Sequence, residues 1–211
     1  MNILRISCSP RGASSESQRL SQKIVDRLVA QAPAANVVER SIGDGSLAHV
    51  DANYALAQHA AAAEVSSLGS MATSDVLIRE LERSDAIVIA TPMHNLGVPS
   101  VLKAWLDHVV RARRTFHVTA AGKVGALRDR PVYLAIASGG RFSGEQARQP
   151  DFLTPHLKAI LGTIGLHDVR LFSVEGTGAG AEAVEAARAR ADQALAAHFA
   201  IARVERVPDA T

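Results

Sequence analysis

The chain has a single cysteine, little net charge and no long hydrophobic run, and each of these shortages excludes a class of protein. One cysteine among 211 residues, Cys8, cannot form an internal disulfide. No apolar run approaches the roughly 18 residues that suggest a membrane-spanning helix, so we expect a soluble protein without a membrane partner. The formal net charge of +2 offers no electrostatic case for binding nucleic acid.

Metal ligands and a secretion signal are also missing. The eight histidines have neither the spacing nor the neighbouring cysteines of a metal site, and we predict no metal centre. The chain begins with the strand-like segment MNILRISCS and lacks the successive regions of a signal peptide, which predicts a cytoplasmic protein. The composition, with 47% hydrophobic and 21% charged residues, predicts one globular domain over residues 1–211.

Aliphatic segments alternate with segments of helical periodicity along the chain. We predict buried strands at residues 3–8, 85–90, 131–137 and 169–174, with a weaker fifth at 36–40. Between them, apolar residues recur at helical spacing, as at Leu20, Ile24 and Leu28. This alternation predicts an α/β fold with a five-stranded parallel sheet in the flavodoxin-like order 2-1-3-4-5 and helices on both faces.

Two segments fit this scheme less directly. Residues 41–75 form a long excursion before a helix that ends near Arg83, and they suit either a surface loop with a short helix or a lid or dimer element. Residues 181–202 predict an alanine-rich closing helix, followed by a frayed tail to Thr211.

In an open parallel sheet the ligand lies at the carboxyl ends of the strands, so the loops there carry the functional prediction. The first loop, SPRGASSES at residues 9–17, offers several hydroxyls and the free N–H groups of a helix start. It lacks the Gly-Lys-Ser/Thr ending of a nucleoside triphosphate loop, which favours a terminal monophosphate. Alternatively, Ser15 caps the helix and Gln18 completes a capping box.

The second and third loops suit a flat heterocycle. Residues 91–99, TPMHNLGVP, contain two prolines and a glycine that fix the shape of the loop, and Met93 and Leu96 supply apolar contact. The other interpretation is a turn that starts the next helix. In the third loop, at residues 137–141, adjacent glycines allow positive φ and close approach of a planar ligand.

The chain resembles the FMN-dependent NADH azoreductases, which also act as quinone reductases, over nearly its full length. The matching positions are Ser9, Ser15-Glu16-Ser17, Pro92-Met93-His94-Asn95, Leu102-Lys103, Asp107, Arg111, Thr115-Phe116, Gly139-Gly140, Thr154-Pro155, Leu161-Gly162, Ile164-Gly165 and Glu175-Gly176. The sequence departs from the family at His94 and Leu96, where the family has aromatic residues, and at Ala137-Ser138, where it has Ser/Thr-Arg.

The resemblance implies an FMN enzyme that takes hydride from NADH or NADPH and passes it to a quinone or azo compound. It implies that Ser9, Ser15, Glu16 and Ser17 bind the FMN phosphate. The implied ring-binding residues are Pro92, Met93, His94, Asn95, Leu96, Ala137, Ser138, Gly139 and Gly140. It also implies a homodimer in which Phe116 is an aromatic wall of the pocket, and the arginines beside Phe116 show no intrachain role in the sequence.

His94 is the one histidine that these loops place in the predicted site. Its imidazole could donate a hydrogen bond to a quinone oxygen that gains charge, and this would make acceptor reduction sensitive to pH. The alternative is that His94 faces solvent and only fills the position.

Three other features have plainer interpretations. The segment GTGAGA at 176–181 matches a dinucleotide motif, but no further strand or acidic residue follows to bind a ribose. Cys8 suits a buried small hydrophobe better than a redox switch. We predict that Arg111, Arg113 and Arg114 mark a helix end, where the helix dipole favours cations.

Two rival functions share the predicted fold. A flavodoxin-type FMN electron carrier is disfavoured by the near-neutral charge, because such carriers are commonly acidic for docking. A phosphoacceptor signalling domain needs carboxylates for Mg²⁺ after the first strand, where this chain has Ser7, Cys8 and Ser9. Hydride turnover is absent from both rivals.

Overall fold

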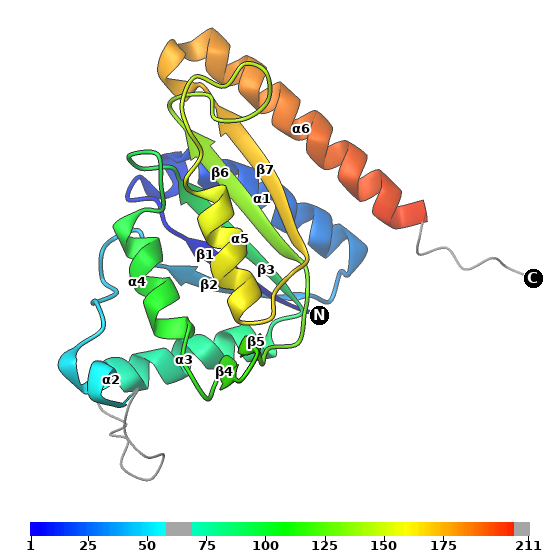
Figure 1. Ribbon diagram of the computed structural model, residues 1–211. Coiled ribbons are helices and arrows are strands. Elements are labelled where there is room, and N and C mark those ends of the chain that lie inside the picture. The colour runs from blue at the N-terminus through cyan, green and yellow to red at the C-terminus, as the bar shows by residue number, and fades with distance from the viewer. Residues whose placement is uncertain (58–68, 205–211) are drawn as a thin grey trace, which may run out of the picture.

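A five-stranded parallel sheet forms the centre of the computed structural model, which describes residues 1–57 and 69–204 (Figure 1). The strands are β1 (Asn2–Ser7), β2 (Asn36–Ser41), β3 (Ala86–Pro92), β6 (Val132–Ser138) and β7 (Val169–Glu175). Their order is β2-β1-β3-β6-β7, which is 2-1-3-4-5 when only these five are counted. The predicted flavodoxin-like order is therefore confirmed.

The burial of each strand explains how strongly its sequence signalled it. In β3, residues 86–91 are all buried, as expected for a central strand covered on both faces. The edge strand β2 has no buried residue, which accounts for its weak aliphatic signal. The predicted strands agree with the observed ones to within two residues at every end.

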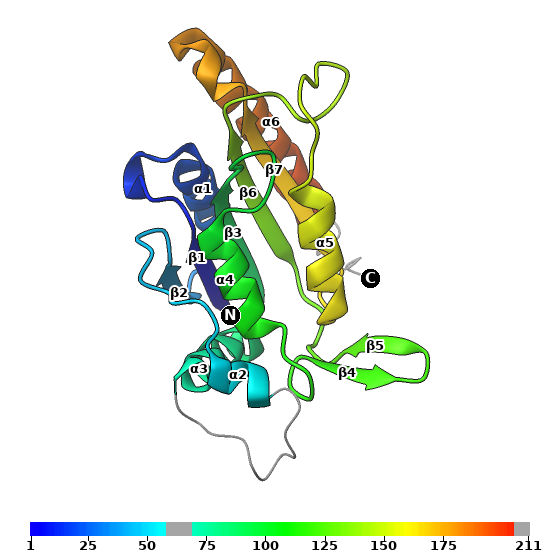
Figure 2. The same ribbon diagram turned by 60° about the vertical axis from the view of Figure 1, so that its left-hand side comes forward.

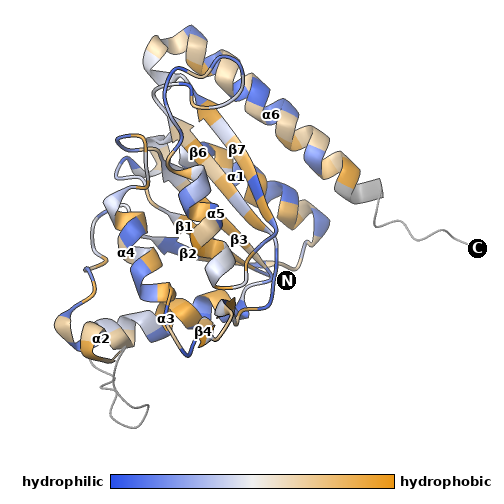
Figure 3. Cartoon of the chain, in the orientation of Figure 1, coloured by the Kyte–Doolittle hydropathy of each residue, from blue (hydrophilic) through white to orange (hydrophobic). Residues whose placement is uncertain are grey.

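Helices cover both faces of the sheet (Figures 1 and 2). They are α1 (Glu16–Gln31), α2 (Ala52–Ala57), α3 (Ser70–Arg83), α4 (Ser100–Val109), α5 (Thr154–Thr163) and α6 (Ala181–Val204). Side chains of α1 and α6 form one core layer with the sheet, and side chains of α3, α4 and α5 form the other. The hydropathy colouring shows this pattern, with apolar strands between helices that turn polar residues outward (Figure 3).

The excursion at residues 41–75 contains the short helix α2 and the start of α3. Its described part is anchored on α4: Tyr54 donates a hydrogen bond to the Asp107 carbonyl over 2.8 Å, and His108 Nε2 lies 3.0 Å from the Ala48 carbonyl oxygen. The prediction of a surface loop with a short helix fits these ranges. The segment 58–68 and the predicted tail at 205–211 lie outside the described residues, and the single domain over 1–211 stays a prediction.

A small antiparallel hairpin, β4 (Phe116–Thr119) and β5 (Gly122–Gly125), was not predicted. It projects beyond the sheet near one end of α5 (Figure 2). Its strands have four residues each and only Phe116 is buried. The sequence therefore contains no aliphatic run here that would predict a strand. No helix in residues 1–57 and 69–204 is long and apolar enough to cross a bilayer.

The arginines after α4 have intrachain partners, which corrects two expectations. Arg111 is buried and donates to Ser74 Oγ over 2.9 Å and to Asp75 Oδ1 over 2.5 Å. Arg114 donates to Asp75 over 3.1 Å and to Glu82 over 3.3 Å. Helix α4 ends at Val109, so these side chains tie the segment to α3. They are not spare cations at a helix end, and they give no support to a dimer.

Candidate functional site

The three predicted loops meet at one edge of the sheet because β1, β3 and β6 are parallel neighbours. Ser7 at the end of β1 pairs with Ala90, and Pro92 at the end of β3 pairs with Ala137. Beyond the strands, Met93 N–H donates to the Ala137 carbonyl over 2.8 Å. The first, second and third loops therefore form adjacent walls of one site (Figure 1).

The first loop leaves the start of α1 open to a ligand. Ser15 occupies the N-cap position but its side chain makes no capping bond, and its Oγ lies 2.8 Å from Ser17 Oγ. Gln18 accepts a hydrogen bond from Ser7 Oγ over 2.8 Å. The capping-box interpretation is therefore wrong, because both of its side chains are bonded to other hydroxyls.

The free donors of this loop suit a phosphate. The N–H groups of Glu16, Ser17 and Gln18 belong to the first turn of α1, where no intrahelical acceptor is available. Together with the Ser15 hydroxyl they are the kind of donors that suit an anion at a helix N-terminus. Ser17 is fully buried behind Ser15, so its hydroxyl supports the Ser15 side chain. Ser9 Oγ accepts from Arg11 N–H over 3.3 Å.

Glu16 contributes its backbone to this loop, because its carboxylate is engaged elsewhere. Arg188 of α6 donates to Glu16 Oε1 over 2.5 Å, and Arg19 donates to Oε2 over 3.1 Å. The bond from Arg188 is the main cause that holds the pKa of Glu16 below its ordinary value, and Arg19 acts in the same direction. The two arginines offset a negative charge that would otherwise repel a phosphate.

Replacing Glu16 by glutamine is expected to lower the free energy of unfolding at pH 7 by about 1 to 2 kcal/mol, since charge-assisted hydrogen bonds are lost. The folded-state pKa is depressed, so this stabilisation is present above the unfolded pKa of about 4.3. It disappears as the pH falls through the lower folded value. Urea unfolding at several pH values measures the difference.

Glu185→Gln is the matched control, because Glu185 also pairs with Arg188 but its side chain is 69% exposed against 16% for Glu16. We expect it to change stability little at any pH. A difference between wild type and Glu16→Gln that persists unchanged at pH 3 would contradict the assignment.

The second loop is a tight turn with unusual backbone geometry. His94 and Gly97 exchange backbone hydrogen bonds of 3.1 and 2.9 Å. The two residues between them, Asn95 and Leu96, have φ of 47° and 68°. Asparagine tolerates this left-handed region, but for leucine it is strained, and such strain gathers at functional sites. The positive φ thus falls on Asn95 and Leu96 and not on Gly97. The His94 and Asn95 side chains are exposed.

The two glycines of the third loop leave space beside the backbone. Neither Gly139 nor Gly140 has positive φ, which corrects that part of the prediction. A Cβ on Gly140 would lie 2.1 Å from Gln149 Oε1. The GTGAGA segment packs against the same loop: Gly178 N–H donates to the Gly139 carbonyl and Gly176 N–H to the Gly140 carbonyl, each over 3.1 Å. The glycines of GTGAGA therefore hold the third loop through backbone hydrogen bonds.

The comparisons with known proteins agree with this geometry. The flavodoxin-like fold family matches residues 1–199. An FMN-dependent NADH:quinone oxidoreductase from Pseudomonas fluorescens is 44% identical over 194 residues, covering 92% of this chain and 93% of that protein. One from Aromatoleum aromaticum is 41% identical over 202 residues, covering 95% and 100%.

The chain belongs to the FMN-dependent NADH:quinone oxidoreductase family. Solved structures support the fold. An azoreductase from Bacillus anthracis superposes with a TM-score of 0.78 at 22% identity, covering 92% of this chain and 98% of that one. An FMN-dependent NADH-azoreductase from the same species, solved in complex with FMN, gives 0.76 at 20% identity, covering 94% and 100%.

For a member of this family, the question is whether the loops fit FMN. The helix-start donors match a terminal monophosphate, as argued above. One glycine from each loop, Gly12, Gly97 and Gly139, faces open space, since an added Cβ would meet no atom within 4 Å. Met93 and Ser138 are both buried where the second and third loops meet. The residues present therefore fit an FMN molecule.

Two residues that the sequence analysis singled out, Cys8 and Phe116, do not belong to the three loops. Cys8 is completely buried in the core, and burial raises the pKa of its thiol, which confirms the plainer interpretation. Phe116 follows α4, whose first residue, Ser100, adjoins the second loop, so about 15 Å of helix separates Phe116 from that loop. Its ring is 7% exposed, and Lys123 Nζ lies 5.2 Å from the ring centroid.

Sequence reasoning missed two residues of the segment that follows the third loop. Gln149 contacts both Met93 and Ser138. Phe152 donates its N–H to the Leu96 carbonyl over 3.1 Å and leaves its ring 62% exposed beside the second loop. Residues 142–153 have no periodic pattern, so nothing in the sequence singled out Gln149 or Phe152.

Proposed function

We propose that this chain is an FMN-dependent NADH:quinone oxidoreductase that also reduces azo compounds, in a ping-pong cycle that accepts NADH or NADPH. The observation that supports this proposal best is the junction of β1 and α1. There the uncapped N–H groups and the Ser15 hydroxyl suit a terminal phosphate, in a chain of this family.

In the proposed reaction, the residues of this chain bind the cofactor and orient it. FMN, when bound, accepts hydride from a nicotinamide and delivers it to the acceptor. The helix-start donors would hold the phosphate, and backbone groups of the second and third loops would hydrogen-bond the flat ring. No side chain of the site is required as a nucleophile. The backbone N–H groups of the strained turn at Asn95 and Leu96 would act as fixed dipoles that stabilise negative charge on the bound group.

Cofactor identity and turnover test this proposal together. The purified protein should release FMN on heating, with no FAD, and should oxidise NADH when a quinone is present. Recovery of FAD, or failure to retain flavin after reconstitution with excess FMN, would refute it. FMN binding without NADH turnover would favour the electron-carrier alternative.

We further propose that the active unit is a homodimer in which Phe116 completes the partner's pocket. Phe116 lies beyond the far end of α4, too distant to reach the site of its own chain. The hairpin that carries it leaves Val118 73% and Val124 51% exposed, and it projects from the body of the chain (Figure 2). An exposed apolar hairpin is a suitable contact for a second copy.

Replacing Val118 and Val124 together by aspartate is expected to convert the dimer to monomer at micromolar concentration, because unpaired carboxylates resist burial. Sedimentation of the FMN-loaded protein measures this, and NADH turnover should fall with dissociation. Ile201→Asp, an equally exposed apolar position at 62%, should leave the sedimentation unchanged. A fully active monomer would sink the proposal.

The exposed His94 side chain lies in the second loop beside the proposed acceptor space. If its imidazole donates a proton or hydrogen bond to the acceptor, kcat/KM for a quinone between about pH 5.5 and 8.5 will depend on pH through a histidine. We expect His94→Phe to remove that dependence and to leave kcat/KM for NADH unchanged. His49→Phe, an exposed histidine outside the three loops, should retain the wild-type profile. Superimposable profiles for His94→Phe and wild type would end this assignment.

A further inference from the structure

The side chain of Gln149 joins the two loops that flank the proposed ring position. Its Nε2 donates to Met93 Sδ over 3.0 Å and to Ser138 Oγ over 3.2 Å. Met93 belongs to the second loop and Ser138 closes β6 at the third. No other described side chain donates hydrogen bonds to both of these residues.

Gln149 belongs to the segment 141–149, which is held in place by backbone hydrogen bonds and by one carboxylate. Arg148 N–H and Gln149 N–H donate to the Arg141 carbonyl over 2.8 and 3.2 Å. Near the start of the segment, Phe142 N–H and Ser143 N–H donate to the Glu175 carboxylate over 2.8 and 3.1 Å. Glu175 also accepts from the hydroxyls of Ser143 and Ser173 over 2.6 and 2.7 Å. The segment is thereby tied to the edge strand β7.

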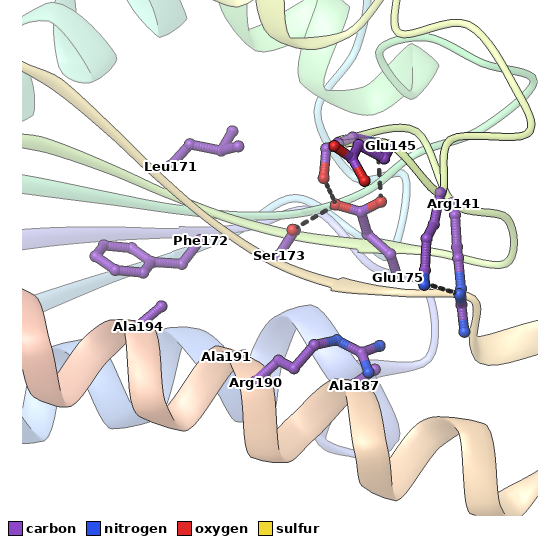
Figure 4. Close-up of a pocket in the computed structure, with 13 residues that line it drawn as sticks. Arg141, Glu145, Leu171, Phe172, Ser173, Glu175, Ala187, Arg190, Ala191 and Ala194 are labelled. Carbon is purple, nitrogen blue, oxygen red and sulfur yellow. Dashed lines mark hydrogen bonds between the residues drawn. The ribbon is translucent and has the colours of Figure 1, made fainter.

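Figure 4 shows the hydrogen bonds of the Glu175 carboxylate. Beside them, a cavity of about 360 Å³ lies between the segment, β7 and α6. The Glu175 carboxylate points from β7 toward the segment, and Ser173 bonds to it from the same strand. Of the three loops, only the third reaches this cavity, through its last residue, Arg141. The cavity therefore lies on the other side of the segment from the first two loops, and Glu175 contacts the third loop both through the segment and through its strand pairing with Ser138.

Gly140 leaves the space that the Gln149 amide occupies. A Cβ at position 140 would lie 2.1 Å from Gln149 Oε1 and 2.8 Å from Cδ. Since Gly140 has no positive φ, its backbone does not require glycine. Glycine at this position leaves room for the Gln149 amide, which a Cβ would displace.

We propose that Gln149 is a positioning residue for FMN: the backbone already pairs the second and third loops, and by bonding Met93 and Ser138 the Gln149 amide fixes these two side chains and with them the seat of the ring. This inference rests on the proposed function. Without the amide, the Met93 and Ser138 side chains lose their shared donor and keep only the direct contact of 3.8 Å from Ser138 Oγ to Met93 Sδ.

Gln149→Leu keeps most of the side-chain volume and removes both donors, and Gln149→Asn keeps the amide on a shorter side chain. We expect both variants to bind FMN about tenfold more weakly, the size of a little more than one lost hydrogen bond. The absorption bands of the bound flavin should shift because these two side chains beside the ring move. Fluorescence titration of the apoprotein and a visible spectrum measure these two effects.

Gln146→Leu is the matched control, because Gln146 lies in the same segment and its side chain bonds Arg141. It should leave both readouts unchanged. Gly140→Ala should reproduce the Gln149→Leu effect by displacing the amide. The double variant should be no weaker than either single one, since both changes remove one interaction.

Each outcome decides the proposal. Equal FMN affinity and an identical spectrum in Gln149→Leu and wild type would overturn it. So would an effect shared by Gln146→Leu, or a loss of thermal stability in the apoprotein without a spectral change, because either would mean general support of the segment. Failure of the wild-type protein to bind FMN would instead overturn the proposed function.

Discussion

Replacing Ser15 and Ser17 together by alanine is expected to weaken FMN binding by about 1 to 3 kcal/mol, or roughly 5- to 150-fold. The Ser15 hydroxyl stands at the start of α1 without a capping bond, and Ser17 holds it from behind over 2.8 Å. The double change removes a donor to a charged phosphate and the group that orients it. Fluorescence titration of the apoprotein with FMN measures the loss.

The control for this experiment is Ser14→Ala. Ser14 lies in the same loop, is exposed, and donates its hydroxyl to the Arg11 carbonyl over 2.8 Å. We expect its FMN affinity to remain within twofold of wild type, as for a surface substitution of about 0.5 kcal/mol or less. If the Ser15/Ser17 variant binds FMN like wild type and only its unfolding free energy falls, the two hydroxyls serve the fold and not the ligand.

Arg111→Ala is expected to lower the free energy of unfolding by about 3 kcal/mol, the lower end for breaking a buried ion pair. The Arg111 side chain is 7% exposed and bonds Ser74 and Asp75. Its removal leaves the Asp75 carboxylate facing a cavity, with only the outer Arg114 as a partner. Because Asp75 is 27% exposed, water relieves part of the cost. Urea unfolding followed by circular dichroism measures it.

Arg114→Ala provides the comparison, since it removes a second arginine from the same carboxylate at a site where the side chain is 37% exposed. Exposed pairs contribute about 0 to 1 kcal/mol, so the loss should be small. Equal losses for the two variants would show that burial of Arg111 does not set the strength of this contact. Such a result would favour the sequence-based interpretation that these arginines are cations placed near a helix end by its dipole.

The parts of the site that could be predicted from sequence follow from local pattern and sheet geometry. Aliphatic runs located β1, β3 and β6, and parallel pairing then required the segments after them to meet. Glu16 shows the limit of this reasoning. Its place in the turn was predicted, but its carboxylate turns to Arg188, 172 residues away in the chain, and no local signal announces such a partner.

By itself, the sequence determined the order of strands and helices, the three loops at the carboxyl edge and the family, because strand periodicity and turn residues are local properties of the chain. Only the tertiary structure decided that Ser15 leaves its helix uncapped, that Leu96 takes the strained backbone position, that Arg111 pairs with Asp75 and that Gln149 spans two loops. Arg111 and Gln149 depend on which side chain from a distant segment arrives within hydrogen-bond reach, 36 and 56 residues away in the chain, and that is settled by the packing of whole elements. Ser15 and Leu96 depend on exact backbone geometry and side-chain rotamers, which residue patterns do not specify.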